Sequence, residues 1–496
     1  MNKANRTLAI LLSLLTALPL VACGEEKVPS DGIDVSSDTT VANESGYNYP
    51  DVDYGGYEFR VLNFDEYCNT NLRVDVEEQT GEKLDDAIYL RNRKVEDKLG
   101  FKMKEIQYPG NEGWSTSQKN LINLVTTSVM AGDDEYDAAY LNLYFNTGVI
   151  TDGCLVALTT IDTLDLKADW WDHTINDSIT INGKLFGASS PMMLETFDFA
   201  WCLFFNESLM TDFKMDYPYQ LVRDGKWTID KLYEYVSAGA TLNGDSDFKN
   251  WKDDGNSIYG IAGHLSAADY TFLHSAGCDY ISNVDGEYKL VVESDRLYTA
   301  FDRLKTLLSL DSGYVRFDNS NREFKNGYLS MFANDRALFM TGELKSAMEE
   351  RDMVSDFGIL PFPKLEESDN YRTLVNGCAT ALLCVPVTNK DLDRTGVILD
   401  ALSYESNESV LPVYYDVTVS QKGLRNDDSI EMLEIIKETR SCELADFFGL
   451  AGDMVKSFQK ILASGGTEAP ASVIASNKEK IANNIATLIE NIEKLG

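Results

Sequence analysis

The chain has 496 residues, of which 44% are hydrophobic and 25% charged, enough for two or more packed units of an ordinary globular protein. Acidic residues outnumber basic ones by 80 to 44, which gives a net charge of -36. So acidic a surface repels phosphate backbones and anionic headgroups, which argues against nucleic acid as a partner.

The first 23 residues have the features of an export signal. A basic start precedes an apolar run over residues 8–20, and Leu20-Val21-Ala22 stands directly before Cys23. The run is too short to span a bilayer and is broken by Pro19, so we expect a cleaved signal peptide over residues 1–22. The four residues that end at Cys23 resemble a bacterial lipobox, which implies lipidation of Cys23 and anchoring to the extracellular face of the bacterial cell membrane. The alternative is an ordinary signal peptide with a cysteine nearby.

Residues 23–55 are rich in Asp, Ser, Thr, Glu and Gly and lack apolar periodicity. We expect them to form a lipidated N-terminus followed by a flexible linker. Apart from Cys23, seven cysteines remain, an odd number, so at least one is unpaired. No CxxC motif or Cys/His array with metal-ligand spacing occurs, and we expect neither a metal nor another cofactor.

Beyond the linker, segments with strand and helix periodicity alternate. We predict strands at residues 57–63, 101–107 and 138–143, and helices at residues 84–99, 120–130, 231–238, 295–308 and 476–495. Thr228 can cap the helix at 231–238, and Trp227 can pack against Leu232. Strands separated by helices favour parallel sheets covered on both faces. No segment after the signal has the apolar length of a transmembrane helix.

Seven short motifs follow one another along the body of the chain: Glu58-Phe59-Arg60-Val61, Arg91-Asn92-Arg93 with Val95-Glu96, Ala131-Gly132-Asp133-Asp134-Glu135-Tyr136-Asp137, Ile181-Asn182-Gly183-Lys184-Leu185-Phe186, Phe204-Phe205-Asn206, Gly225-Lys226-Trp227-Thr228 and Phe357-Gly358-Ile359-Leu360-Pro361. Their order resembles that of extracellular solute-binding proteins of family 1, the sugar-type receptors of ABC importers. The larger clostridial-type members are the most similar.

The resemblance implies an α/β periplasmic-binding-protein fold of type II, a Venus flytrap of two lobes joined by hinge-crossing strands. Lobe I would comprise residues 56–190 and 361–409, and lobe II residues 197–355 and 411–496. The hinge crossings would lie near residues 189–197 and 357–363. Prolines 191, 361 and 363 suit such extended segments, although an ordinary loop explains any single one of them equally well.

The resemblance also implies a function without chemistry. The protein would be a monomeric lipoprotein that captures a carbohydrate, an oligosaccharide in our interpretation, and delivers it to the transmembrane subunits of an ABC permease. No GxSxG, HExxH or P-loop motif occurs in the sequence. The alternatives are a surface-tethered glycoside hydrolase, whose turnover of an oligosaccharide would distinguish it, and a carbohydrate sensor or adhesin.

Ligands of open α/β sheets bind beyond the carboxyl ends of strands. The residues at such positions or near the crossings, which we predict to bind ligand, are Asn63, Asp65, Glu66, Asn142, Tyr144, Asp198, Trp201, Glu343, Tyr371 and Asn376. Aromatic rings suit the faces of a sugar, and carboxylates and amides suit its hydroxyl groups. For each residue the alternative is core packing or a solvated surface charge. For Trp170-Trp171 we favour a helix staple or a packed loop over sugar stacking, and for Asp133-Asp134-Glu135 a turn over a calcium loop.

Overall fold

The computed structural model describes residues 46–64, 73–248, 255–264, 270–309, 313–317, 327–349, 353–419, 424, 426–464 and 466–495. The chain divides into two units, Met1–Gly46 and Tyr47–Gly496, and every helix and strand below belongs to the second unit. The predicted signal peptide and Cys23 therefore lie outside the described residues. Within the described residues, no helix has the length and apolar character needed to cross a bilayer.

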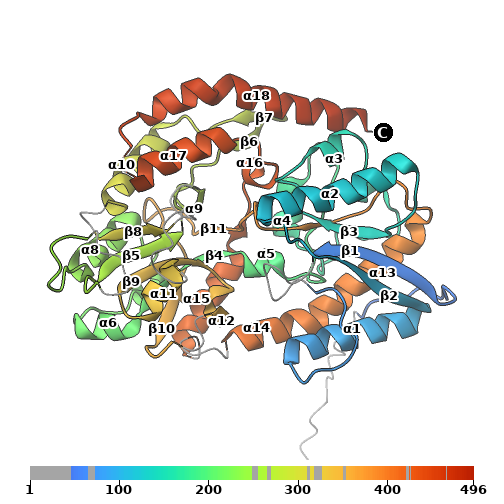
Figure 1. The fold of residues 1–496 in the computed structure, drawn as a ribbon, viewed down its shortest axis with the longest axis horizontal. Coiled ribbons are helices and arrows are strands. Elements are labelled where there is room, and N and C mark those ends of the chain that lie inside the picture. The colour runs from blue at the N-terminus through green and yellow to red at the C-terminus, as the bar shows by residue number, and fades with distance from the viewer. Residues whose placement is uncertain are drawn as a thin grey trace, which may run out of the picture. The chain divides into compact units, whose positions relative to one another are not determined.

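The first sheet has four strands in the order β12-β3-β1-β2 (Figure 1). Its strands are β1 (Tyr57–Phe64), β2 (Phe101–Tyr108), β3 (Ala138–Leu141) and β12 (Leu382–Cys384). β1 runs parallel to β2 and β3, whereas β12 is antiparallel to β3. The connecting helices are α1 (Lys83–Leu99) and α2 (Trp114–Ala131). α1 ends at Gly100, whose φ of 68° is a left-handed conformation that glycine adopts without steric cost.

The second sheet has five strands in the order β10-β4-β9-β5-β8. Its strands are β4 (Trp201–Asn206), β5 (Tyr259–His264), β8 (Tyr314–Phe317), β9 (Ala337–Glu343) and β10 (Phe357–Leu360). β5 is parallel to β8 and β9, and β4 is antiparallel to β9 and β10. The helices around it include α8 (Ile229–Gly239), α10 (Asp295–Leu307), α11 (Gly327–Ala333) and α15 (Asp427–Glu438).

Shorter elements and the C-terminal helices complete the fold. Two small sheets consist of β6 (Ile281–Val284) with β7 (Glu287–Leu290), and of β11 (Thr373–Leu374) with β13 (Arg440–Ser441). The other helices are α3 (Gly148–Thr151), α4 (His173–Ile179), α5 (Glu195–Asp198), α6 (Glu207–Asp212), α7 (Tyr219–Arg223), α9 (Tyr270–Ser275), α12 (Ser346–Glu349), α13 (Leu392–Glu405), α14 (Leu411–Val419), α16 (Leu444–Phe447), α17 (Gly452–Ser464) and α18 (Pro470–Lys494), with a 3-10 turn at Leu158–Thr160 and a π-helical turn at Ser406–Val410.

The chain passes between the two sheets several times. It leaves the first sheet after Ala188, which pairs with Leu383, and enters the second at Trp201 by way of α5 (Figure 1). It returns between Leu360 and Leu382. α14 packs against α1, and the following α15 packs against β10. The lobe and hinge boundaries expected from the sequence stay predictions.

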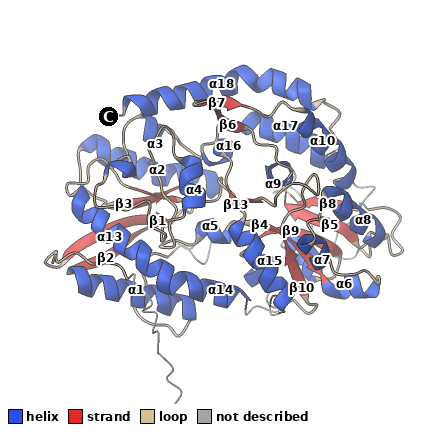
Figure 2. Ribbon diagram, turned by 180° about the vertical axis from the view of Figure 1, so that it is seen from behind, coloured by secondary structure: helices blue, strands red, loops and turns tan. Residues whose placement is uncertain are grey.

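Helix α18 makes a further link on another side of the protein. It packs against α17 in one half, against β7 near its middle and against α3 toward its C-terminal end (Figures 1 and 2). Lys184 Nζ donates to the carbonyl oxygen of Ile492 at 3.0 Å and to that of Leu495 at 2.5 Å. A lysine at the last carbonyls of a helix satisfies acceptors that have no partner within the helix.

The predicted strands and helices are confirmed, with bounds that shift by a few residues. The largest differences are the N-terminal extensions of α2, which begins at Trp114, and of α18, which begins at Pro470. Thr228 caps α8 as predicted, because its Oγ1 accepts from Lys231 N at 3.3 Å. The expectation of parallel sheets is right for only part of each sheet, since β12, β4 and β10 run antiparallel to their neighbours. These three strands adjoin the crossings, where the chain enters a sheet from the other side.

Candidate functional site

The carboxyl edge of the first sheet carries a buried amide and a half-buried tyrosine. Asn142, which follows β3, is fully buried, and its Nδ2 donates to the carbonyl oxygen of Cys378 at 2.9 Å. Its Oδ1 accepts from the backbone N–H of Tyr144 at 3.2 Å. Asn142 therefore shapes the loop that carries Tyr144 and ties that loop to the segment between β11 and β12.

The second sheet places a tryptophan and a glutamate side by side at one edge. β4 begins at Trp201 and the antiparallel β9 ends at Glu343, and these two residues pair directly in the ladder. The Glu343 side chain keeps 13% of its surface exposed, and Lys345 Nζ lies 3.7 Å from its Oε2. Asn376 Nδ2 donates to Glu343 Oε1 at 2.6 Å. The carboxylate is thus oriented by an amide and faces a cation.

A continuous series of hydrogen bonds joins the two edges. It runs from Asn142 to the backbone carbonyl of Cys378, whose Sγ donates to Asn376 Oδ1 at 3.1 Å, and from Asn376 to Glu343. Asn376 and Cys378 are both partly exposed. Buried amides and carboxylates need hydrogen-bond partners, so this series holds polar groups in fixed positions between the two sheets.

Two acidic residues of α5 lie beside this series and are covered. Asp198 is fully buried, and its Oδ1 accepts from Tyr414 Oη at 2.7 Å. Glu195 Oε2 accepts from the backbone N–H of Ala381. Burial raises the pKa of Glu195 to about 8, and the charge of Asp198 adds to this, while that of Lys345 opposes it.

Aromatic rings form a row along the carboxyl edge of the first sheet. The ring centroids of Phe64 and Trp114 are 6.3 Å apart, those of Trp114 and Phe145 6.4 Å, and those of Phe145 and Tyr144 5.1 Å. Trp114, Phe145 and Tyr144 are partly exposed, whereas Phe64 is buried. Our sequence prediction missed Trp114 and Phe145, although the place of Phe145 just after β3 was the signal that could have identified it. Together these rings offer apolar surface next to the polar series.

The remaining predicted site residues lie elsewhere or outside the described residues. Asn63 is buried and donates to Glu105 Oε1 at 2.6 Å, on the neighbouring strand. Tyr371 Oη donates to the carbonyl oxygen of Val222 at 3.1 Å, near α7 and away from the series. Asp65 and Glu66 are outside the described residues. The structure thus brings together Asn142, Tyr144, Trp201, Glu343 and Asn376 directly, with Asp198 beneath them.

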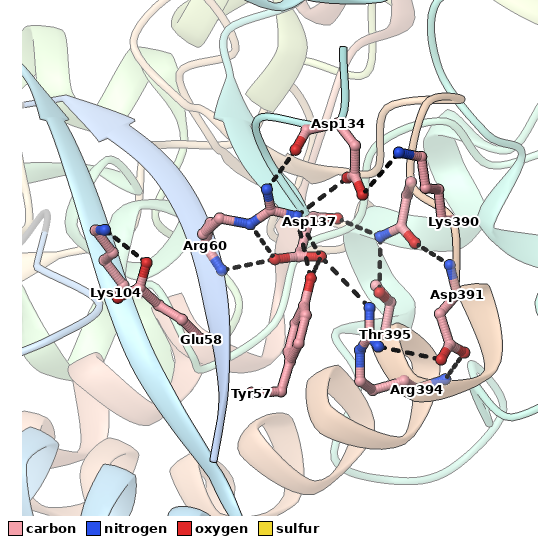
Figure 3. A network of polar contacts seen from close by, with 11 residues as sticks. Tyr57, Glu58, Arg60, Lys104, Asp134, Asp137, Lys390, Asp391, Arg394 and Thr395 are labelled. Carbon is pink, nitrogen blue, oxygen red and sulfur yellow. Dashed lines mark hydrogen bonds and ion pairs between the residues drawn. The ribbon is translucent and has the colours of Figure 1, made fainter. Parts of the chain in front are cut away.

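The acidic motif before β3 belongs to a separate polar network (Figure 3). Arg60 pairs with Asp137 at 2.9 Å and with Asp134 at 3.0 Å. Tyr57 Oη donates to Asp137 Oδ1 at 2.7 Å, and the Arg394 guanidinium lies 3.5 Å from the centre of the Tyr57 ring. The hydrogen bond to Asp137 raises the pKa of Arg60 against the opposing effect of burial. This network fixes the amino end of the first sheet, so Asp134 and Asp137 of the motif have structural partners.

The paired tryptophans also have a structural partner. The indole Nε1 atoms of Trp170 and Trp171 both donate to Asp400 Oδ1 at 2.9 Å. Trp171 is buried and Trp170 packs against the core. Of the two structural roles predicted for this pair, the structure shows the packed loop.

No protein-family model and no curated protein matches the sequence. Solved structures do match, although at low identity. An ABC substrate-binding protein from Listeria monocytogenes in complex with cycloalternan is 15% identical with a TM-score of 0.54, over 87% of this chain and 99% of that one. The galacto-N-biose/lacto-N-biose I-binding protein of an ABC transporter from Bifidobacterium longum, in complex with lacto-N-biose, is 12% identical with a TM-score of 0.58, over 88% and 98%.

A third match is a sugar transporter protein from Rhizobium etli in an open conformation, 14% identical with a TM-score of 0.55, over 89% of this chain and 100% of that one. The protein therefore has the mixed α/β, two-lobe fold of periplasmic sugar-binding proteins, as the resemblance implied. These structural neighbours are ABC sugar-binding proteins rather than enzymes. The clostridial-type subclass stays a prediction.

Proposed function

We propose that this protein is the extracellular substrate-binding lipoprotein of an ABC importer, which captures a carbohydrate between its two lobes and delivers it unchanged to a permease. The observation that carries the proposal is the series from Asn142 to Glu343, which places polar groups between the two sheets beside partly exposed aromatic rings. Solved structures with this fold hold cycloalternan and lacto-N-biose. The lipobox-like sequence before Cys23 supports the anchor.

The chemistry of the series suits a sugar. Glu343 can accept from two hydroxyl groups of a ligand, while Trp114, Phe145 and Tyr144 can pack against a pyranose face. A sugar with a different arrangement of hydroxyl groups would leave a polar group of the site desolvated and without a hydrogen-bond partner, which costs about 1 to 3 kcal/mol for each group. We therefore expect the polar groups to set selectivity and the aromatic rings to supply general affinity.

Ligand binding and closure of the two lobes are thermodynamically linked, and this linkage lets the protein deliver its ligand without a chemical step. A ligand that touches both lobes makes its full set of contacts only in the closed arrangement, so it shifts the equilibrium toward closure by its difference in affinity for the two arrangements. A permease could then recognise the closed form. The buried state of Asp198 and Glu195 beneath the series also argues against a role for these carboxyl groups in hydrolysis.

Calorimetric titration of the mature protein with a panel of neutral oligosaccharides tests the proposal. We expect one-to-one binding of at least one member, with the sugar recovered intact by mass spectrometry. Failure of every saccharide to bind, or appearance of cleaved products, would contradict it. Cleaved products would instead support the glycoside hydrolase. Radiolabelled palmitate in cells, with Cys23→Ala as the control, tests the anchor.

A further inference from the structure

A hollow of about 490 Å³ opens where three parts of the chain meet. Its walls are the end of α4, the β6–β7 hairpin and the segments next to β11 and β13. In Figure 2 the β6–β7 hairpin lies next to α18, and α4 and β13 lie nearer the middle of the protein. The volume lies within the range of small-molecule sites, which is about 300 to 1,000 Å³. The lining, as far as the structure describes it, contains none of the ten residues predicted to bind ligand, so this hollow is distinct from the candidate site above.

The walls are fixed to one another by hydrogen bonds. Tyr288 Oη, in the hairpin, donates to the carbonyl oxygen of Thr180, just beyond α4, at 3.1 Å. Glu443 Oε1 accepts from the backbone N–H groups of Tyr280 and Ile281, at 3.1 and 2.9 Å, which joins the segment after β13 to the hairpin. A hollow with fixed walls requires little ordering when a ligand enters, and this favours binding.

The charges on the lining are largely balanced. Arg372 Nη2 lies 2.7 Å from Asp279 Oδ1, and His274 Nδ1 lies 3.3 Å from the same oxygen. Burial alone would raise the pKa of Asp279, but the hydrogen bond from His274 and the charge of Arg372 hold it well below its usual range. Burial raises the pKa of Glu443 to about 8. The remaining ionic group of the described lining is Asp177, which is exposed and disfavours anions.

The rest of the lining is made of neutral polar residues together with Ile281, Cys442 and Leu444. Ser178 and Thr180 come from one wall, and Ser282, Asn283 and Tyr288 from the other. The hydroxyl groups of Ser178, Thr180 and Tyr288 already donate to backbone carbonyl oxygens, so toward a ligand they can accept. The Asn283 amide and the Ser282 hydroxyl can also donate, and the hydroxyl groups of a polyol or a sugar suit both kinds of partner. We propose that this hollow is a second binding site, which takes a neutral, hydroxyl-rich molecule no larger than a disaccharide.

The position of the hollow couples it to the arrangement of the lobes. Thr180 precedes the first crossing, on the chain that Ala188 pairs with Leu383 of the first sheet, whereas Tyr288 follows that crossing. Lobe movement would have to break the hydrogen bond from Tyr288 to Thr180 that joins these walls, so a ligand in the hollow would favour the present arrangement of the lobes. Occupancy of the hollow and of the interlobe site should then alter each other's affinity by the same factor. This coupling rests on the proposed function, but binding in the hollow does not.

The test uses glucose and sucrose as probes in titrations followed by ligand-observed saturation-transfer NMR. Ser282→Trp places an indole into the hollow, and Val284→Trp is the matched control, because Val284 is exposed on the same strand and does not line the hollow. We expect saturable binding of a probe to the native protein, at least tenfold weaker binding to Ser282→Trp and unchanged binding to Val284→Trp. Ser178→Trp fills the hollow from the opposite wall and serves if Ser282→Trp does not fold.

Three outcomes would overturn the proposal. They are absence of saturable binding of both probes, equal binding by the native and filled proteins, and stronger binding in the hollow of glucosamine or glucose 6-phosphate than of glucose. The variant Glu343→Gln separates this site from the proposed function, since it should weaken oligosaccharide binding and leave the Ser282→Trp-sensitive signal unchanged. If no oligosaccharide binds while glucose or sucrose still binds in a manner that Ser282→Trp abolishes, the proposed function is wrong and the proposal of a second site is retained.

Discussion

The buried ion pair between Asp172 and Arg440 allows a sharp prediction about stability. Arg440 Nη1 lies 2.9 Å from Asp172 Oδ2, and the two side chains are 9% and 3% exposed. Asp172 also accepts from Ser189 Oγ at 3.0 Å, on the chain that leads into the first crossing. The change Asp172→Asn keeps the size of the side chain but leaves Arg440 as a buried cation without its counter-charge.

The expected loss follows from this burial. Breaking a buried pair from one side costs about 3 to 5 kcal/mol, because the remaining charge stays out of water. Asparagine can still accept from Ser189, so we take the lower end, about 3 kcal/mol. The folded unit, Tyr47–Gly496, has about 450 residues, for which the unfolding entropy is about 0.9 kcal/mol per kelvin. The melting temperature should therefore fall by about 3 °C.

Urea unfolding followed by tryptophan fluorescence, together with calorimetry, measures this loss. The matched control is Asp453→Asn, which removes a carboxylate that lies 2.5 Å from Lys480 on the exposed surface and should change nothing measurable. The double variant Asp172→Asn with Arg440→Gln should be more stable than Asp172→Asn alone, since it removes the unpaired cation. Equal effects of Asp172→Asn and Asp453→Asn would refute the reasoning.

Three further predictions concern the candidate site and the crossing. The change Asn376→Ala should weaken oligosaccharide binding in calorimetry by about 10- to 100-fold, because Asn376 holds the Glu343 carboxylate in place and a misplaced carboxylate would lose its hydrogen bond to the sugar, a bond to a charged group that contributes about 1.5 to 3 kcal/mol. Asn407→Ala, at a partly exposed position outside the series, should not weaken binding, and equal affinities of the two variants would contradict this. Glu195→Gln should be more stable in urea than the native protein at pH 7 to 8, and this difference in unfolding free energy should disappear toward pH 4.5. The pKa of Glu195 is near 4.5 in the unfolded chain and about 8 in the folded protein, so the native protein loses stability as the pH rises between these two values. A difference that does not change with pH would refute the raised pKa as its cause. Gly377→Ala should cost about 1 to 3 kcal/mol in the same assay, because its Cβ would lie 2.9 Å from the backbone nitrogen of Phe447, whereas Gly452→Ala, with open space, should have little effect; no difference between these two variants would contradict the packing.

The fold was predictable because its signals are local. The alternating residues of 57–63 and the apolar stripe of 84–99 depend only on neighbours along the chain, and both elements form as expected. The antiparallel strands were not predictable in this way, since β12 pairs with β3 across more than 200 residues. Short strands of three or four residues also lack the length over which periodicity can be read.

The candidate site was predictable in position but not in its contacts. Asn142 and Glu343 were predicted because they stand at the carboxyl ends of strands, where ligands of open α/β sheets bind. The carbonyl of Cys378 that binds Asn142 lies 236 residues away and has no signal in the sequence. The direction of a side chain was also beyond reach, as Tyr371 shows by bonding to Val222 rather than joining the series. Whether the residues brought together bind ligand stays a prediction.

The segment that carries Asn376 and Cys378 unites the site with the crossing. Asp446 Oδ2 accepts from the backbone N–H of Gly377 at 2.7 Å, and Glu195 accepts from that of Ala381. Burial raises the pKa of both carboxyl groups, to about 7 for Asp446 and about 8 for Glu195. Movement of the segment would break the hydrogen bonds from its backbone to Asp446 and Glu195. These two bonds therefore resist displacement of the residues between Gly377 and Ala381. In the proposed function, a sugar hydroxyl bound at Glu343 would therefore act, through Asn376, on the same short segment that links the two sheets, which gives ligand binding a direct route to the arrangement of the lobes.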